Sequence, residues 1–294
     1  SNKYSIVQLP SINTLREIGY LRSVKNTKKQ KPFVGFGDPF FNKKHAQINN
    51  NQLAQTRGQQ KTLLRGLLPI HKKSNSSSPS KIDISVLPRL PDTRDEILSI
   101  AKALNADLNS DVYFGENAKE ENVLNRDLSD YRVISFATHG LIPGDLNGLY
   151  EPALALSHPD ISNSKGDGLL TATEILGMNL SADIAVLSAC NTAAGDGVGA
   201  ESISGLGRSF FYAGAKSILV SNWPVHSAAT NTLMTNLFTH LANDKNINRS
   251  EALRKTQMEM VHELGYEENG KLAFSYAHPI FWAPFTLVGD GGNN

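Results

Sequence analysis

The chain has little cysteine, little net charge and no long apolar run. Its single cysteine, Cys190, excludes an intrachain disulfide and a cysteine-rich metal site, and it fits a reducing compartment. The formal net charge is +1, which gives the chain as a whole no bias toward nucleic acid or anionic lipid. No apolar run approaches the roughly 18 residues of a membrane-spanning helix, and the first residues hold no apolar signal core. We therefore expect a cytoplasmic protein without a nucleic-acid or membrane partner.

The chain does have enough apolar material for a sizeable core. Hydrophobic residues make up 40% of its 294 residues and charged residues 19%, a balance that excludes wholesale disorder. A chain of this length corresponds to about two average domains or to one α/β domain of ordinary size. No internal repeat is visible in the sequence.

One segment, residues 42–82, differs in composition from the rest. It carries only basic charges, for a net charge of +8, which leaves −7 for the remainder of a chain whose total is +1. It also contains runs of Asn, Gln and Ser, a composition that buries too little apolar area to offset the entropy of ordering. Because it has no aromatic residues to stack on bases, we expect a flexible basic insertion at the surface rather than a nucleic-acid-binding arm.

Elsewhere, apolar runs alternate with amphipathic stretches. Runs that are apolar throughout and rich in β-branched residues are typical of strands covered on both faces. The expected strands are Pro32–Gly35, Val112–Gly115, Tyr131–Thr138, Asp183–Ala189, Lys216–Ser221 and Pro284–Val288. Two further runs, Pro152–Leu156 and Leu169–Thr171, predict a hairpin that interrupts the alternation.

The amphipathic stretches predict helices between these strands. Asp92 is the expected cap of one helix, and Thr171 with Glu174 has the spacing of a capping box. Two more helices are expected over Glu201–Ala213 and Ala228–Leu241, where apolar residues recur on one face. Alternating strands and helices predict a mainly parallel sheet with helices on both faces.

In an open α/β sheet, chemistry collects beyond the carboxyl ends of the strands. One predicted strand runs directly into His139-Gly140 and another into Cys190. A histidine about 50 residues upstream of an Ala-Cys pair matches the caspase spacing, and a thiolate beside an imidazole is the reactive pair of a cysteine peptidase. The backbone N–H groups of Gly140 and Cys190 can form an oxyanion hole for such a reaction.

Plainer interpretations of these residues stay open at this point. A lone cysteine at a strand end is most often a buried small hydrophobe, and a lone His-Gly pair is more often a turn. Residues 195–200 also fit the Gly-x-Gly-x-x-Ala fingerprint of dinucleotide-binding loops, but the following strand ends at Asn222 without the carboxylate that would bind the ribose. Nucleotide binding is therefore disfavoured, and no nucleophile elbow, Walker loop or His-Glu-x-x-His motif is present.

Several blocks of the chain, in order, resemble the CHAT domains, the bacterial relatives of caspases and separase. The two signature blocks are Ala137-Thr138-His139-Gly140 and Leu187-Ser188-Ala189-Cys190-Asn191-Thr192-Ala193. The other matching blocks are Leu9-Pro10-Ser11, Leu90-Pro91 with Glu96 and Ile97, Gly168–Ala172, Ala213-Gly214-Ala215, Trp223-Pro224-Val225, His278-Pro279 and Trp282–Asp290. The resemblance covers nearly the whole chain apart from residues 42–82.

This resemblance implies a caspase-like three-layer α/β/α sandwich with a mainly parallel sheet and a Cys–His dyad. Cys190 would attack the scissile carbonyl, His139 would act as acid and base, and the Gly140 and Cys190 amides would hold the oxyanion. Trp223 resembles a tryptophan that walls the substrate cleft, although packing is its plainer role. No cofactor is implied.

The chain departs from the family where many members carry an acidic residue that recognises a basic side chain before the cut bond. His226 and Ser227 stand there instead, so a tolerant pocket is expected. Asp145, Asp196 and Glu201 are the other acids expected near the cleft. Ser188 and Asn222 complete the candidate substrate-binding residues, because each lies at the carboxyl end of a predicted strand.

We expect one CHAT domain over residues 1–294 that cleaves a protein partner. The chain starts abruptly within the family pattern, which suggests truncation at its N-terminus and control by a regulatory module that precedes it or is separate. The alternative is a catalytically silent interaction domain that keeps the fold. The presence of both His139 and Cys190 argues against this alternative.

Overall fold

The computed structural model describes residues 4–9, 29–47, 82–188, 205–223, 225–268 and 270–292. Its centre is a six-stranded sheet with the order β11-β8-β7-β3-β1-β2. All neighbouring pairs are parallel except β8 and β11, which run antiparallel. The strands are β1 (Lys31–Pro39), β2 (Val112–Gly115), β3 (Tyr131–Ala137), β7 (Ile184–Leu187), β8 (Ser217–Ser221) and β11 (Phe285–Gly289). The six predicted strands are thus confirmed, with ends that shift by a few residues.

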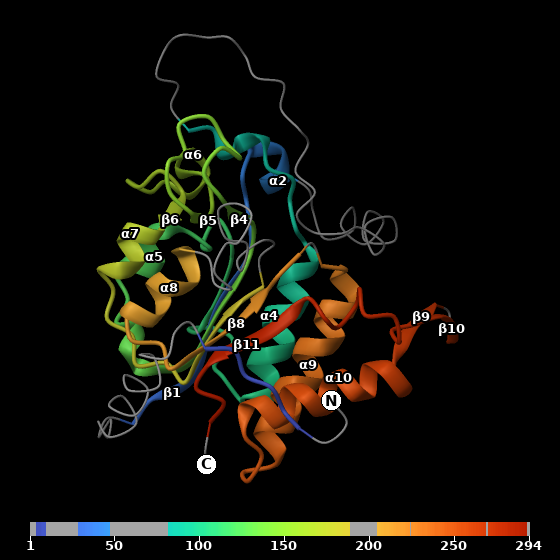
Figure 1. Ribbon diagram of the computed structural model, residues 1–294. Helices are drawn as coiled ribbons and strands as arrows, with labels where there is room; N and C mark the ends of the chain where they lie inside the picture. The colour runs from blue at the N-terminus through green and yellow to red at the C-terminus, as the bar shows by residue number, and fades with distance from the viewer. Residues whose placement is uncertain are drawn as a thin grey trace.

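Helices cover both faces of this sheet and make a three-layer α/β/α sandwich, as the sequence predicts (Figure 1). Side chains alternate between the faces along each strand, so Ile134 and Phe136 of β3 point to one core and Val133 to the other. One face packs against α5 (Glu120–Leu124), α7 (Ala172–Leu176) and α8 (Gly205–Tyr212). The other face packs against α4 (Asp92–Ala103), α9 (Ser227–Asn243) and α10 (Arg249–His262).

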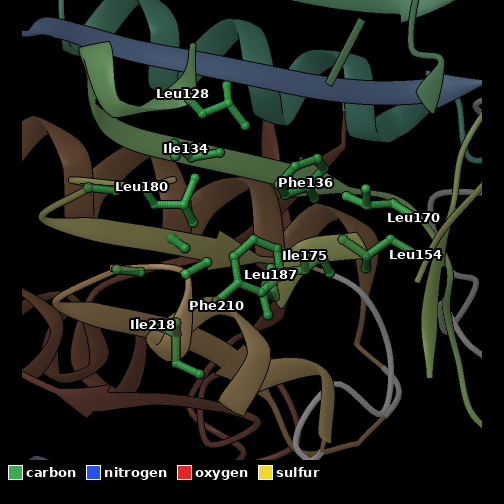
Figure 2. Packing of buried hydrophobic residues seen from close by; sticks show 14 of the residues in the cluster. Leu128, Ile134, Phe136, Leu154, Leu170, Ile175, Leu180, Leu187, Phe210 and Ile218 are labelled. Carbon is green, nitrogen blue, oxygen red and sulfur yellow. The ribbon is translucent and has the colours of Figure 1, made fainter. Parts of the chain in front are cut away.

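The first of these cores is built around β3, β7 and β8. Phe136 and Phe210 of α8 have ring centroids 5.7 Å apart, and Leu187 and Ile218 fill the space beside them (Figure 2). All four side chains are fully buried. This core therefore fixes the strands just before the points where they end at the candidate site.

A smaller antiparallel sheet adjoins the carboxyl end of β3. It consists of β4 (Gly140–Leu141), β5 (Ala153–Ala155) and β6 (Leu169–Thr171), so the predicted hairpin is confirmed and β4 is an additional strand. A third core, with Phe41, Ile84 and Leu169 at 0–1% exposure, packs beneath it. Short elements nearby are α2 (Lys43–Gln47), η1 (Ile84–Val86), η2 (Leu128–Asp130) and α6 (Pro159–Ser162).

The helix starts agree with the sequence in one case and differ in another. Thr171 and Glu174 form the predicted capping box. Asp92, in contrast, is the first residue of α4 rather than its cap, because Pro91 occupies the cap position and makes no side-chain hydrogen bond. Asp92 instead lies in the first turn, where its negative charge interacts favourably with the helix dipole.

Several features fall outside the sequence prediction or outside the described residues. The helix α10 and the hairpin of β9 (Gly265–Glu268) and β10 (Lys271–Ser275) carried no clear sequence signal. Of the expected insertion, residues 42–47 and 82 are described, and Lys43–Gln47 form α2; residues 48–81 lie outside the described ranges. In the described parts of the chain, no helix has the length and apolar character needed to cross a membrane.

Candidate active site

His139 lies where β3 ends and the chain turns into β4. Its side chain is 3% exposed, and its Nε2 lies 2.8 Å from the carbonyl oxygen of Pro88. A carbonyl oxygen only accepts hydrogen bonds, so Nε2 is the nitrogen that carries the proton in the neutral ring. The unprotonated nitrogen of that tautomer is Nδ1, which is the nitrogen that can take up a proton from a thiol.

Two neighbours hold the imidazole and its backbone. The ring of Phe41 lies 5.5 Å from the His139 ring, centroid to centroid, in a tilted arrangement. The backbone carbonyl of His139 accepts a hydrogen bond from the N–H of Ala155 at 2.9 Å, which ties it to β5. The position of His139 is thus fixed by the small sheet on one side and by the chain after β1 on the other.

The strand that leads to Cys190 is a direct neighbour of β3. Phe136 pairs with Leu187 in the parallel ladder, and the N–H of Ser188 donates to the Phe136 carbonyl at 3.0 Å. Ser188 is fully buried, two residues before the cysteine. The strand adjacency on which a His139–Cys190 pair depends is therefore present, while Cys190 itself lies outside the described residues, as do Asp196 and Glu201.

Gly140, the expected oxyanion donor, is the first residue of β4. It pairs with Leu154 of β5 and is half-buried. The residue thus stands directly after the candidate acid–base histidine, at the open end of the large sheet.

The carboxyl end of β8 carries two further candidates, Asn222 and Trp223. The side-chain amide of Asn222 donates to the carbonyl of Pro284 and to the hydroxyl of Thr286, both at 2.8 Å, and so joins β8 to β11. Trp223 has 39% of its surface exposed at the same end of the sheet. Trp223 is therefore exposed at this end of the sheet, and Asn222 links the end of β8 to β11.

His226 and Ser227, at the family's specificity position, belong to the start of α9. His226 is the N-cap, because its Nδ1 accepts a hydrogen bond from the N–H of Ala229 at 3.3 Å. Its ring also packs edge-on against Phe274 and Phe281, with centroids 5.7 and 5.3 Å away. Ser227 is 5% exposed in the first helical turn. These contacts give His226 a structural role at the helix start.

Asp145 lies in the loop between β4 and β5. Its Oδ2 accepts a hydrogen bond from the N–H of Ile142 at 2.9 Å, and its own N–H donates to the Ile142 carbonyl at 3.1 Å. The carboxylate therefore closes a turn of its own loop. The sequence analysis expects this acid near the cleft, and the contacts described here lie within its own loop.

A buried charge cluster near His139 was missed by the sequence analysis. Asp38, the penultimate residue of β1, has a left-handed φ of 47° and is fully buried. Arg89 donates from Nε to Oδ1 at 2.7 Å and from a terminal nitrogen to Oδ2 at 2.9 Å, and Arg94 adds a contact of 3.2 Å. The position of Gly37-Asp38-Pro39 at a strand end was the sequence signal for Asp38. Nothing in the sequence paired it with an arginine 51 residues away.

Arg89 of this cluster also contacts another histidine, His45, and affects its pKa. His45 of α2 accepts a hydrogen bond from the N–H of Phe41 at 3.2 Å, and its carbonyl accepts one from Arg89 at 3.1 Å. Burial, together with the positive charges of Arg89 and protonated His139, lowers the pKa of His45 from 6.5 to about 4. His45 is therefore neutral near pH 7.

Comparison with known proteins places this arrangement in a family. Over 124 residues the chain is 33% identical to tetratricopeptide repeat protein 28 of Mus musculus, and over 122 residues it is 31% identical to that of Homo sapiens. Each alignment covers 42% of this chain and 4% of the relative, so this chain matches a small part of those proteins.

The fold is similar to one in the crystal structure of the Saccharomyces cerevisiae separase–securin complex. The TM-score is 0.51 at 13% identity, with 98% of this chain and 14% of that chain covered. The model of the CHAT domain family matches residues 1–290. The chain therefore belongs to the CHAT domain family.

Proposed function

We propose that this protein is a cysteine endopeptidase of the CHAT type that cleaves a protein partner with a His139–Cys190 dyad. The observation that carries the proposal is the placement of His139. Its imidazole is buried at the end of β3 with Nε2 engaged by the Pro88 carbonyl, and the neighbouring strand β7 leads into Cys190. A histidine held in this tautomer presents Nδ1 as the base for a thiol.

In the proposed reaction, the Cys190 thiolate attacks the scissile carbonyl and forms a carbon–sulfur bond. The N–H groups of Gly140 and Cys190 stabilise the oxyanion, and protonated His139 gives its proton to the leaving amine as the carbon–nitrogen bond breaks. His139 then removes a proton from water, whose oxygen attacks the thioester. The carbon–sulfur bond breaks, the new carboxyl end leaves, and the pair returns to its starting state.

For the substrate, we propose an extended peptide segment beside Trp223 and a tolerant pocket for the residue before the cut bond. Asp145 already accepts a hydrogen bond within its own loop, and His226 caps α9. Neither group supplies the unpaired buried carboxylate that strict selection of Arg or Lys needs. Because the curated relatives are named for tetratricopeptide repeats, we propose that a module of recognition repeats presents the substrate or controls the enzyme.

A peptide-library experiment tests this proposal. The purified chain is incubated with the library and new termini are identified by mass spectrometry, in parallel with Cys190→Ala, His139→Ala and the matched control His262→Ala. His262 is an exposed histidine at the end of α10, so its truncation controls for loss of a histidine outside the site.

We expect cleavage by the parent chain and by His262→Ala, and cleavage below a few per cent for both dyad variants, since a nucleophile and its base act as a unit. Cleavage retained by Cys190→Ala would contradict the peptidase assignment. Cleavage by none of the four proteins would instead favour the silent interaction domain.

A further inference from the structure

We propose that the buried ion pair between Asp38 and Arg89 is a positioning device for His139. The pair holds the Pro88 carbonyl in place, and that carbonyl in turn sets the orientation and the tautomer of the imidazole. The inference rests on the proposed function, in which His139 is the acid–base residue. Asp38 and Arg89 are positioning residues in this account, because neither one touches the reacting atoms.

The covalent link between the ion pair and the histidine is short. The oxygen that lies 2.8 Å from His139 Nε2 belongs to the peptide unit that joins Pro88 to Arg89. Any shift of the Arg89 backbone therefore moves this oxygen directly. The segment around it is irregular, since it lies between the single turn of η1 and the start of α4, so no helix or strand fixes it.

Arg89 anchors that segment through its whole side chain. Its guanidinium is bidentate to Asp38, with contacts of 2.7 and 2.9 Å, and also donates to the His45 carbonyl at 3.1 Å. It lies 4.5 Å above the ring centroid of Phe40 as well. Arg89 is 8% exposed, so these contacts are protected from water. The planar guanidinium of Arg89, held by these contacts, therefore has a defined position as well as a charge.

Asp38 is itself fixed to the sheet that carries His139. The preceding residue, Gly37, pairs with Ala137 at the end of β3, two residues before the histidine. The N–H of Asp38 donates to the hydroxyl of Thr93 at 2.7 Å, and this bond joins the strand end to α4. The position of Asp38 is thus fixed relative to β1 and β3, and its ion pair fixes the position of Arg89 relative to the same two strands.

The cost of this arrangement indicates a purpose beyond stability. Burying two opposite charges carries a desolvation penalty, and an apolar pair of similar volume is often equally stable or more so. Asp38 also adopts a left-handed backbone conformation, with a φ of 47°, that residues other than glycine seldom occupy. A bidentate pair at this place supplies what apolar packing does not, which is a fixed direction for the Pro88 carbonyl.

The test uses Arg89→Lys, which keeps the positive charge and removes the fork. The matched control is Arg132→Lys: Arg132 donates to Asp183 at 2.9 Å, at the opposite end of the sheet from the site. One readout is the separation of kcat from KM on a peptide that the parent chain cleaves. The second is the tautomer of His139, read from the ¹⁵N shifts and two-bond couplings of its ring, which needs no catalytic activity.

For Arg89→Lys we expect kcat to fall about 10- to 100-fold with KM within about twofold, because a misplacement of about 1 Å costs rate rather than binding. At alkaline pH, where the ring is neutral, its spectrum changes from protonation at Nε2 alone to a mixture of both tautomers, while Arg132→Lys matches the parent in both readouts. A folded Arg89→Lys with parental kcat and the parental tautomer would overturn the inference.

A second variant keeps the test decisive if Arg89→Lys does not fold. Asp38→Asn is nearly isosteric and leaves one acceptor for the guanidinium, and the same change of tautomer is expected for it. If the parent chain cleaves no peptide, the proposed function fails. The ring spectra of the variants then still decide whether the ion pair positions His139.

Discussion

His45 provides a pH-dependent stability that can be measured without a substrate. Burial and the nearby charges of Arg89 and His139 lower its pKa to about 4 in the folded chain, from 6.5. Between pH 6.5 and about pH 4 the unfolded chain binds a proton at this residue and the folded chain does not. Stability from His45 is therefore complete above that pH and is lost as the pH falls toward 4.

The size of the effect follows from the two pKa values. Between about pH 7.5 and about pH 5, a shift of this size corresponds to at most about 2 kcal/mol of unfolding free energy, and solvent screening of the half-buried ring reduces this to about 1–2 kcal/mol. His45→Gln keeps a hydrogen-bonding side chain that does not titrate in this range. We expect the free energy of unfolding of His45→Gln to fall about 1–2 kcal/mol less over the same pH interval than that of the parent chain.

Urea denaturation at the two pH values measures this difference. Protonation of carboxylates whose pKa is lowered, such as Asp183, also reduces the stability of the fold on acidification, but it does so equally in parent and variant. His262→Gln, an exposed control, should follow the parent. Equal pH dependence in His45→Gln and the parent would refute the half-buried, charge-coupled environment described for His45.

Two further predictions concern the core and the pocket. Phe210→Ala should lower the free energy of unfolding by about 3–5 kcal/mol in urea titrations, because the Phe210 ring is fully buried against Phe136. Leu176→Ala should lower it by less than about 1 kcal/mol, because 49% of the Leu176 surface is exposed. Similar losses for both variants would contradict the packing of this core. In matched peptides that differ only before the cut bond, Arg should be preferred over a neutral residue by about tenfold or less, since a fully unpaired buried carboxylate is needed for more. A preference above about 100-fold would point to an acid that recognises the basic side chain.

The sequence predicted the large sheet well because its strands are encoded locally. β3, β7 and β8 are short, largely apolar runs, and their alternation with amphipathic stretches leaves few possible topologies. The capping box at Thr171 was predictable for the same reason, since both partners lie within one helical turn. Asp92 was misplaced by one position because an aspartate in the first turn and one at the cap have the same sequence signature.

The support around His139 was not predictable, because its partners are distant in sequence. The Pro88 carbonyl belongs to the backbone and has no side-chain signature, and the contact spans 51 residues. The Arg89 and Asp38 pair likewise depends on a tertiary approach that spans the whole expected insertion. The contacts of His226 were equally unpredictable, because the two rings against which it packs, Phe274 and Phe281, lie about 50 residues away.

The pairing of Cys190 with His139 is the central claim, and the reactivity of the single cysteine tests it directly. Because the chain has one thiol, every adduct formed with iodoacetamide reports on Cys190. The rate of alkylation is measured against pH for the parent chain and for His139→Ala. We predict a thiol pKa well below the ordinary value of about 8.5 in the parent, and a return toward that value in His139→Ala. Superimposable pH profiles with a midpoint near 8.5 in both proteins would contradict it.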